Sequence, residues 1–239
     1  MIGDGAAAYM SLNLGKNDKK AAKNGIGNSI TLVSILGVLF LIFGLIFNEQ
    51  LLHIFGVTEK SYQFSKDYMM IIIIGLPFFM IGNAINSMIR ADGNPKEAMK
   101  VMLVGAILNM ILDPIAIFIL HWEVKGAALA TIIGQIVSFI FSVRYIKKFQ
   151  SVDLDKESFK PKFKTMKKVM SLGVSSFITQ VAITCVIIVM NNSLKIYGAS
   201  SKYGSDIPIS VLGIVMKMNQ IVNSIVLGIA VGSQPIVRF

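Results

Sequence analysis

Two charged side chains stand inside long apolar stretches of this sequence, where an isolated charge is costly. Asp113 falls within the run 98–120, and Lys217 falls near the middle of the run 207–235. On insertion scales, a charged side chain at the centre of a bilayer costs about 2.5–3.5 kcal/mol, and such residues commonly serve ion or substrate binding. We therefore predict that Asp113 exchanges a proton. Lys217 is a charge partner or a substrate contact, and both roles stay open.

The neighbours of Asp113 support two interpretations. Asn109 precedes it by one helical turn on the same face, so its amide can hydrogen-bond the carboxylate. Pro114 follows directly and frees backbone groups in the preceding turn, which the carboxyl could instead satisfy as a structural cap. Asp4, between Gly3 and Gly5, is a further unusual carboxylate without a partner that the sequence reveals.

Polar and small residues also recur along one face of three apolar runs. At 100° per residue, each set falls within an arc of about 60–80°. Such stripes often only pack helices together in membranes, but three of them favour a water-filled cavity lined by Gln180, Thr184, Lys217 and Gln220. The three sets are Thr131, Gln135, Ser138 and Ser142; Gly173, Ser176, Gln180, Thr184 and Asn191; and Gly213, Lys217, Gln220, Ser224 and Gly228.

The elements that carry these residues follow from composition and run length. The 239 residues are 54% hydrophobic and 15% charged, against about 25% charged in soluble domains. A membrane span needs about 20 mainly apolar residues, and a shorter run, 1–14, precedes six that are long enough. The prediction is an all-α polytopic membrane helix bundle of about six full transmembrane helices plus a truncated first one. The six runs are 25–47, 67–89, 98–120, 126–145, 170–194 and 207–235.

Basic residues set the predicted orientation. Sixteen of them lie in three alternate connections, at 16–23, 90–100 and 144–168, and five lie in the connections between these. Because Lys and Arg concentrate in cytoplasmic loops, the three rich connections are expected in the cytoplasm. Trp122 and Tyr203 are then predicted at the outer interface and Tyr145 at the inner one. Gly93-Asn94-Pro95 is predicted to end one helix and start the next.

Several classes of function find no support in the sequence. No metalloprotease, nucleotide-binding or nucleophile-elbow motif occurs, so we expect no enzyme and no cofactor. The net charge of +10 is explained by the membrane loops rather than by nucleic acid, so the lipid bilayer is the expected partner. Cys185 is the one cysteine and excludes a disulfide framework.

Short segments in this order and spacing resemble the multidrug and toxic compound extrusion (MATE) family of secondary transporters. The resemblance extends over essentially the whole chain. The matching segments are GAAAYMSLNLG at 5–15, LLHIFG at 51–56, RADGNP at 90–95, NMILDP at 109–114, GAALAT at 126–131 and GSQPI at 232–236.

The resemblance implies an architecture of twelve helices in two six-helix lobes related as a parallel repeat. This chain would then run from the end of helix 2 to helix 8. Residues 1–147 would form part of the N-terminal lobe, 148–168 a cytoplasmic inter-lobe loop, and 169–239 the start of the C-terminal lobe with helices 7 and 8.

The resemblance also implies an ion-coupling site and an activity. Asn109 and Asp113 match an Asn and an Asp on helix 5 of the family, Thr131 a Thr on helix 6, and Tyr68 is the candidate for a Tyr on helix 4. The expected function is H⁺- or Na⁺-coupled antiport that exports small organic cations across the cell inner membrane, by a protein that is monomeric at full length. The alternatives are a flippase for lipid-linked oligosaccharides of the same superfamily and a channel or structural protein.

Overall fold

The computed structural model describes residues 1–200, 204 and 206–237, which are mostly helical and contain no strand. Among these residues, eight α-helices follow one another, with a π-helical segment, η1 (Ile115–Ile119), directly after α5 and a 3₁₀ turn, η2 (Lys156–Phe159), before α7. The α-helices are α1 (Ile2–Gly15), α2 (Lys19–Ile46), α3 (Asn48–Ile54), α4 (Glu59–Ala91), α5 (Pro95–Pro114), α6 (Glu123–Ile146), α7 (Phe163–Ala199) and α8 (Asp206–Val237).

Six of these helices are long and apolar enough to cross a membrane, which confirms the predicted spans. Each of the six begins before its predicted start, because hydropathy marks only the apolar part of a helix and not its polar ends. The short helix α3 was not predicted. Gly93 adopts a positive φ of 86° between α4 and α5, and α5 begins at Pro95, so the predicted Gly-Asn-Pro break is confirmed.

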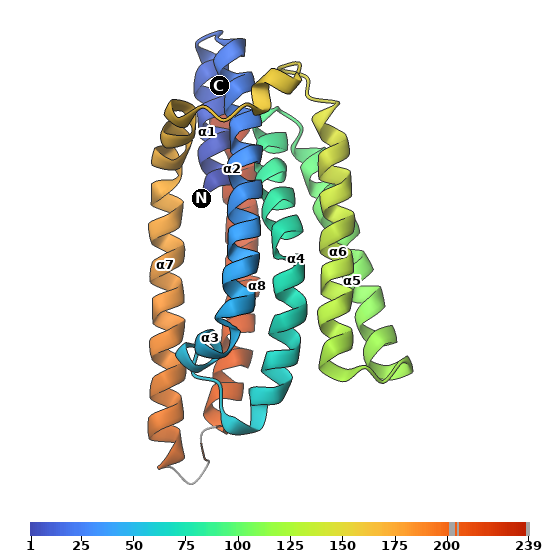
Figure 1. Cartoon of the computed structure of the whole chain (residues 1–239), viewed down its shortest axis with the longest axis vertical. Coiled ribbons are helices and arrows are strands. Elements are labelled where there is room, and N and C mark those ends of the chain that lie inside the picture. The colour runs from blue at the N-terminus through green and yellow to red at the C-terminus, as the bar shows by residue number, and fades with distance from the viewer. Residues whose placement is uncertain (201–203, 205, 238–239) are drawn as a thin grey trace.

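The helices run roughly side by side, so their connections gather at two opposite ends (Figure 1). The α1–α2, α4–α5 and α6–α7 connections lie at one end, which we call the basic end because it carries the three lysine-rich segments. The opposite end holds α3, the α5–α6 connection, the end of α7 and the start of α8. Tight packing near the basic end buries Met10, Ile26 and Met88 completely.

The connection between α6 and α7 is shorter and more ordered than predicted. The stretch 148–168 was expected to be a loop, but it contains η2, and α7 begins already at Phe163. We call residues 147–162 the strap. It crosses the basic end and packs on α2, where an added Cβ at Gly27 would overlap the carbonyl of Ser158. The polar residues of this segment suggested a loop, whereas its contacts with α2 give the strap a defined structure.

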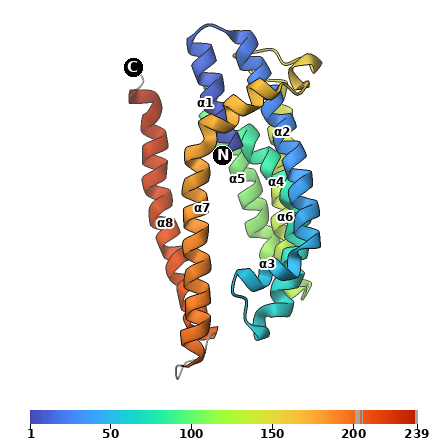
Figure 2. The same cartoon turned by 60° about the vertical axis from the view of Figure 1, so that its left-hand side comes forward.

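Figure 2 shows α7 and α8 set apart from the bundle of α1 to α6 along most of their length. In agreement, few side chains are buried in the middle of α7. Near the basic end, however, Val169 of α7 is fully buried, and a Cβ on Gly5 of α1 would overlap its carbonyl. The inner turns of α7 therefore pack tightly on α1.

Candidate functional site

The predicted ion-coupling residues of α5 and α6 meet in the structure. The Nδ2 atom of Asn109 donates to Oδ1 of Asp113 at 3.2 Å, as predicted, and lies 3.3 Å from Oγ1 of Thr131. The Thr131 hydroxyl itself donates to the carbonyl of Ala127 at 2.9 Å. Its proton is therefore used within α6, and its lone pairs are left for the Asn109 amide. All three side chains are half-buried.

The backbone changes its helical winding directly after Asp113. Pro114 ends α5 and has no N–H to donate, and the π-helical segment η1 follows it. Such π segments often mark functional sites in helices. Among the described residues, the Asn109 side chain is the one hydrogen-bond donor to Asp113. The alternative in which Asp113 caps freed backbone groups therefore has no hydrogen bond to support it.

Tyr68, the fourth predicted member, is not bonded to this cluster. It lies on α4 and is 38% exposed. The preceding Asp67 pairs at 3.4 Å with Lys125, which lies six residues before Thr131 on α6. Tyr68 therefore lies nearer the α5–α6 connection than the Asn109–Asp113–Thr131 cluster does. No hydrogen bond among the described residues joins it to that cluster.

A cavity of about 240 Å³ lies between α4, α5 and α6, with Asn109 and Thr131 in its wall. Its polar lining comes from neutral side chains. Ser138 and Ser142 of the α6 stripe donate to the carbonyls of Val101 on α5 at 3.1 Å and Gly82 on α4 at 3.4 Å. The stripe therefore packs helices together and lines a cavity at once. The lining also includes Asn83, Asn86, Gln135, Phe78, Phe79, Met102 and Ala106.

The predicted substrate-cavity residues lie on two separate helices. Gln180 is exposed on α7, and Thr184 donates to its carbonyl at 2.9 Å within the same helix. Lys217 and Gln220 border a second recess, whose described lining belongs to α8 alone. The described residues do not join these four side chains in one cavity, and their role in substrate binding stays a prediction.

The basic end contains a buried carboxylate, Asp92, that was not among the predicted site residues. Asp92, 6% exposed, accepts hydrogen bonds from the Tyr145 hydroxyl and from the backbone amides of Gln150 and Ser151, each at 3.0 Å. Tyr145 is itself buried, and Asn94 donates to its hydroxyl at 2.8 Å. Tyr145 was predicted at the inner interface as an aromatic anchor, but its side chain is buried and its hydroxyl is bonded within the bundle. The RADGNP segment marked the turn but gave no sign that its carboxylate binds the strap.

The far end of the strap is held by α2. The buried Asn28 side chain accepts the backbone amide of Lys162 and donates to the carbonyl of Ser158 at 3.1 Å. Thr31 donates to the carbonyl of Phe159 at 2.9 Å. Lys23 pairs with Asp155 at 2.7 Å. The strap is thus fixed to the bundle at its start by Asp92 and at its end by α2.

The opposite end of α7 is bonded to α3. Asn192 and Lys195 donate to the carbonyls of Ile54 at 3.0 Å and Val57 at 2.8 Å. The Ile54 carbonyl lies at the end of α3, where helix geometry leaves acceptors without partners, and Val57 follows in the connection to α4. Asp4 also gains a partner that the sequence did not reveal, because Ser87 of α4 donates to it at 3.4 Å. Tyr203 lies outside the described residues.

Comparisons with known proteins agree with the fold and with its extent. The MatE family model matches residues 1–115. The multidrug export protein MepA of Staphylococcus haemolyticus (strain JCSC1435) is 28% identical over 240 residues, which cover 100% of this chain and 52% of that protein. The chain therefore spans about half the length of the curated relatives it matches.

Two solved structures are similar over most of the chain. An outward-facing conformation of a multidrug resistance MATE family transporter of the MOP superfamily has a TM-score of 0.83 and 26% identity, and the match covers 97% of this chain and 51% of that one. An inward-facing conformation of such a transporter has a TM-score of 0.78 and 27% identity, with 90% and 50% covered. Both similarities support the helix arrangement described above.

Proposed function

We propose that this chain is a member of the MATE family and forms about half of a cation-coupled antiporter that exports small organic cations. It is a multi-pass protein of the cell membrane, with six helices able to cross the bilayer. The proposed activity is transport without chemical conversion, driven by H⁺ or Na⁺.

The observation that carries the proposal is the hydrogen-bonded cluster of Asp113, Asn109 and Thr131. A carboxylate within a membrane-spanning segment is a candidate ion site by default. Here its amide and hydroxyl neighbours, Asn109 and Thr131, line a cavity without charged side chains, and the Asn109 side chain links Asp113 to that cavity. A cation entering the cavity would meet neutral oxygen atoms and, beyond Asn109, one carboxylate, which suits H⁺ or Na⁺.

The orientation proposed here places the basic end in the cytoplasm, because it gathers most of the Lys and Arg residues. Cysteines introduced at Lys160, in the strap, and at Thr58, before α4, test this. We expect a membrane-impermeant thiol reagent to label position 160 from the cytoplasmic side and position 58 from outside, in the background Cys185→Ser. Labelling of both positions from one side would contradict the proposed topology.

The central test is Asp113→Asn in a complete transporter that carries this segment. Reconstituted vesicles would be loaded with ethidium, and efflux would be measured under an imposed H⁺ or Na⁺ gradient. We expect Asp113→Asn to abolish gradient-driven efflux with normal insertion, because the amide keeps the volume but cannot take up a cation. Asn109→Ala should give a milder defect.

The matched control is Asp67→Asn, which also removes a carboxylate from a membrane-spanning helix but away from the cluster. It should keep gradient-driven efflux. Efflux at the parental rate in Asp113→Asn would show that this carboxylate is structural. Gradient-independent movement of a lipid-linked sugar instead of ethidium would favour the flippase alternative.

A further inference from the structure

The first turns of α7 present two different faces. Val169 is fully buried on the side toward α1, and Thr165 and Met166 on that side are half-buried. At 100° per residue, Lys164 and Lys167 fall on the opposite side of the helix. Phe163, Lys164, Lys167 and Lys168 are all exposed, and Phe163 is 82% exposed. This end of α7 is therefore amphipathic, with cations turned away from the bundle.

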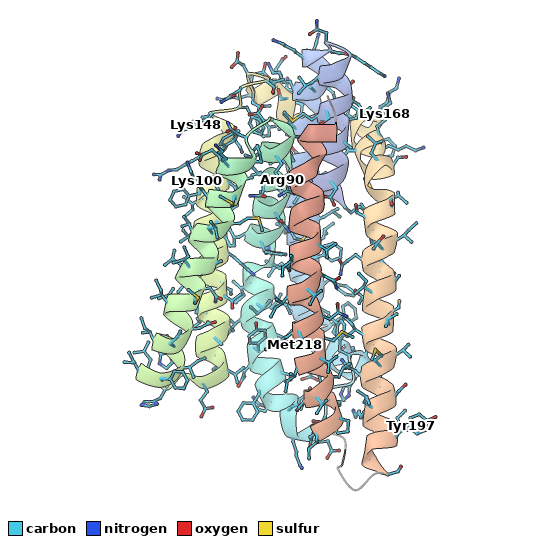
Figure 3. The ribbon with its side chains drawn as sticks, turned by 180° about the vertical axis from the view of Figure 1, so that it is seen from behind. Arg90, Lys100, Lys148, Lys168, Tyr197 and Met218 are labelled. Carbon is cyan, nitrogen blue, oxygen red and sulfur yellow. The ribbon has the colours of Figure 1, made fainter. Side chains whose placement is uncertain are left out.

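The three lysines form no ion pair in the part of the chain that the structure describes. None of the ion pairs among the described residues includes Lys164, Lys167 or Lys168. Two nearby acids of the strap are already engaged, Asp155 with Lys23 at 2.7 Å and Glu157 with Lys160 at 3.6 Å. Figure 3 shows Lys168 at the basic end of α7, the same end as Lys148 and Arg90. The charge of this face is thus uncompensated.

The same face becomes apolar further along α7. Val174, Ile178 and Val189 fall on the side of Lys167, away from Val169, and are 44%, 62% and 63% exposed. A helix surface that is basic at its membrane end and apolar beyond it matches a lipid leaflet, with its charged headgroups and its acyl chains. Lysine stems can lie along the apolar region while their ammonium groups reach the phosphates.

We propose that the α7 face formed by Phe163, Lys164, Lys167 and Lys168 binds the headgroup of an anionic phospholipid. The ammonium groups contact the lipid phosphate, and the exposed phenyl ring packs at the boundary between headgroups and acyl chains, where aromatic side chains are favoured. Charge complementarity carries the choice of ligand, because basic clusters directly beside a membrane span attract anionic lipids. The proposal does not depend on what is transported.

This assignment is specific to α7 and not a property of every basic residue at this end. Lys16, Lys19 and Lys20 are also exposed. Lys16 lies in the α1–α2 connection and Lys19 and Lys20 begin α2, in a region that extends beyond the start of α7 in Figure 1. They therefore contribute to the general positive field of the basic end but lie farther from the apolar part of the helices. This difference provides a matched control with the same loss of charge.

The test places a fluorescent reporter at the proposed site. Phe163→Trp in the background Trp122→Phe leaves one indole in the chain. The full chain is reconstituted in bilayers of phosphatidylcholine with increasing brominated phosphatidylglycerol, or with brominated phosphatidylcholine as the reference. Bromine quenches the indole on contact, so the two titrations give the preference of the site for anionic over zwitterionic lipid.

We expect stronger quenching by brominated phosphatidylglycerol, with the preference falling by roughly 5-fold for each lysine changed to Gln. The triple change Lys164→Gln, Lys167→Gln and Lys168→Gln should remove the preference, and the corresponding triple change to Arg should keep it. The control triple change to Gln at 16, 19 and 20 should leave it within about 2-fold. Two results would overturn the proposal. The parent would show no preference for phosphatidylglycerol, or the two triple changes to Gln would lower that preference equally, as expected if the whole basic end attracts anionic lipid through its overall positive charge.

Discussion

Replacing Asp92 by Ala should release the start of the strap from the bundle. The carboxylate of Asp92 is buried and accepts three hydrogen bonds, two of them from backbone amides of the strap. Ala keeps the helix end but supplies no acceptor. The amides of Gln150 and Ser151 and the hydroxyl of Tyr145 then lose their partner together.

The expected magnitude follows from the number and kind of these bonds. A hydrogen bond to a charged group contributes about 1.5–3 kcal/mol. The two strap amides are only partly buried, so water replaces part of what they lose. A net loss of about 3 kcal/mol remains, equal to roughly 100-fold in the equilibrium for local opening of the strap. Tyr145→Phe removes one of the three donors and should cost about 1 kcal/mol.

Amide hydrogen exchange of a peptide covering residues 147–153 measures this opening, because exchange of protected amides reports local unfolding. The control is Asp153→Ala in the same segment, since Asp153 is exposed and makes no side-chain bond among the described residues. Its exchange should stay within about 2-fold of the parent. Equal protection in Asp92→Ala and Asp153→Ala would refute the assignment of Asp92 as the anchor of the strap.

Three further changes test other contacts. Gly27→Ala should destabilise the protein by about 1–3 kcal/mol in a denaturant titration, because the new methyl group overlaps the Ser158 carbonyl; parental stability would contradict this packing. The bond to Lys23, followed by that to Ser158, holds the pKa of Asp155 well below its usual range. Its stabilising contribution is therefore present above the unfolded carboxyl value of about 3.9 and is lost as the pH falls through the lower folded value. Strap protection, corrected for intrinsic exchange, should fall below about pH 4 in the parent, and Asp155→Asn should already show the lower protection at pH 7. Asn192→Ala should cost about 1 kcal/mol through the lost bond to the end of α3, and an unchanged midpoint of unfolding would show that this contact adds no stability.

Local sequence determined the number of membrane-spanning helices and part of the site. Run length and hydropathy indicated six spans because lipid excludes unpaired backbone groups, so any long apolar segment must form a helix. The four-residue spacing of Asn109 and Asp113 fixed their hydrogen bond, since residues one turn apart on a helix are always neighbours. Gly93 and Pro95 likewise set a helix break through their own backbone preferences.

Contacts between distant segments decided the rest. Thr131 joins Asn109 across 22 residues, and Tyr145 joins Asp92 across 53, whereas Tyr68 stays outside the cluster. The periodicity of one helix reveals which side chains share a face, but not which residues of a neighbouring helix lie beside that face. That alignment depends on close approaches such as Gly105 against the Ser138 side chain, where a Cβ would overlap the hydroxyl. The strap is held for the same reason, because α2 and Asp92 at the end of α4 bind it, in addition to the local hydrogen bonds between Ser158 and Asp155.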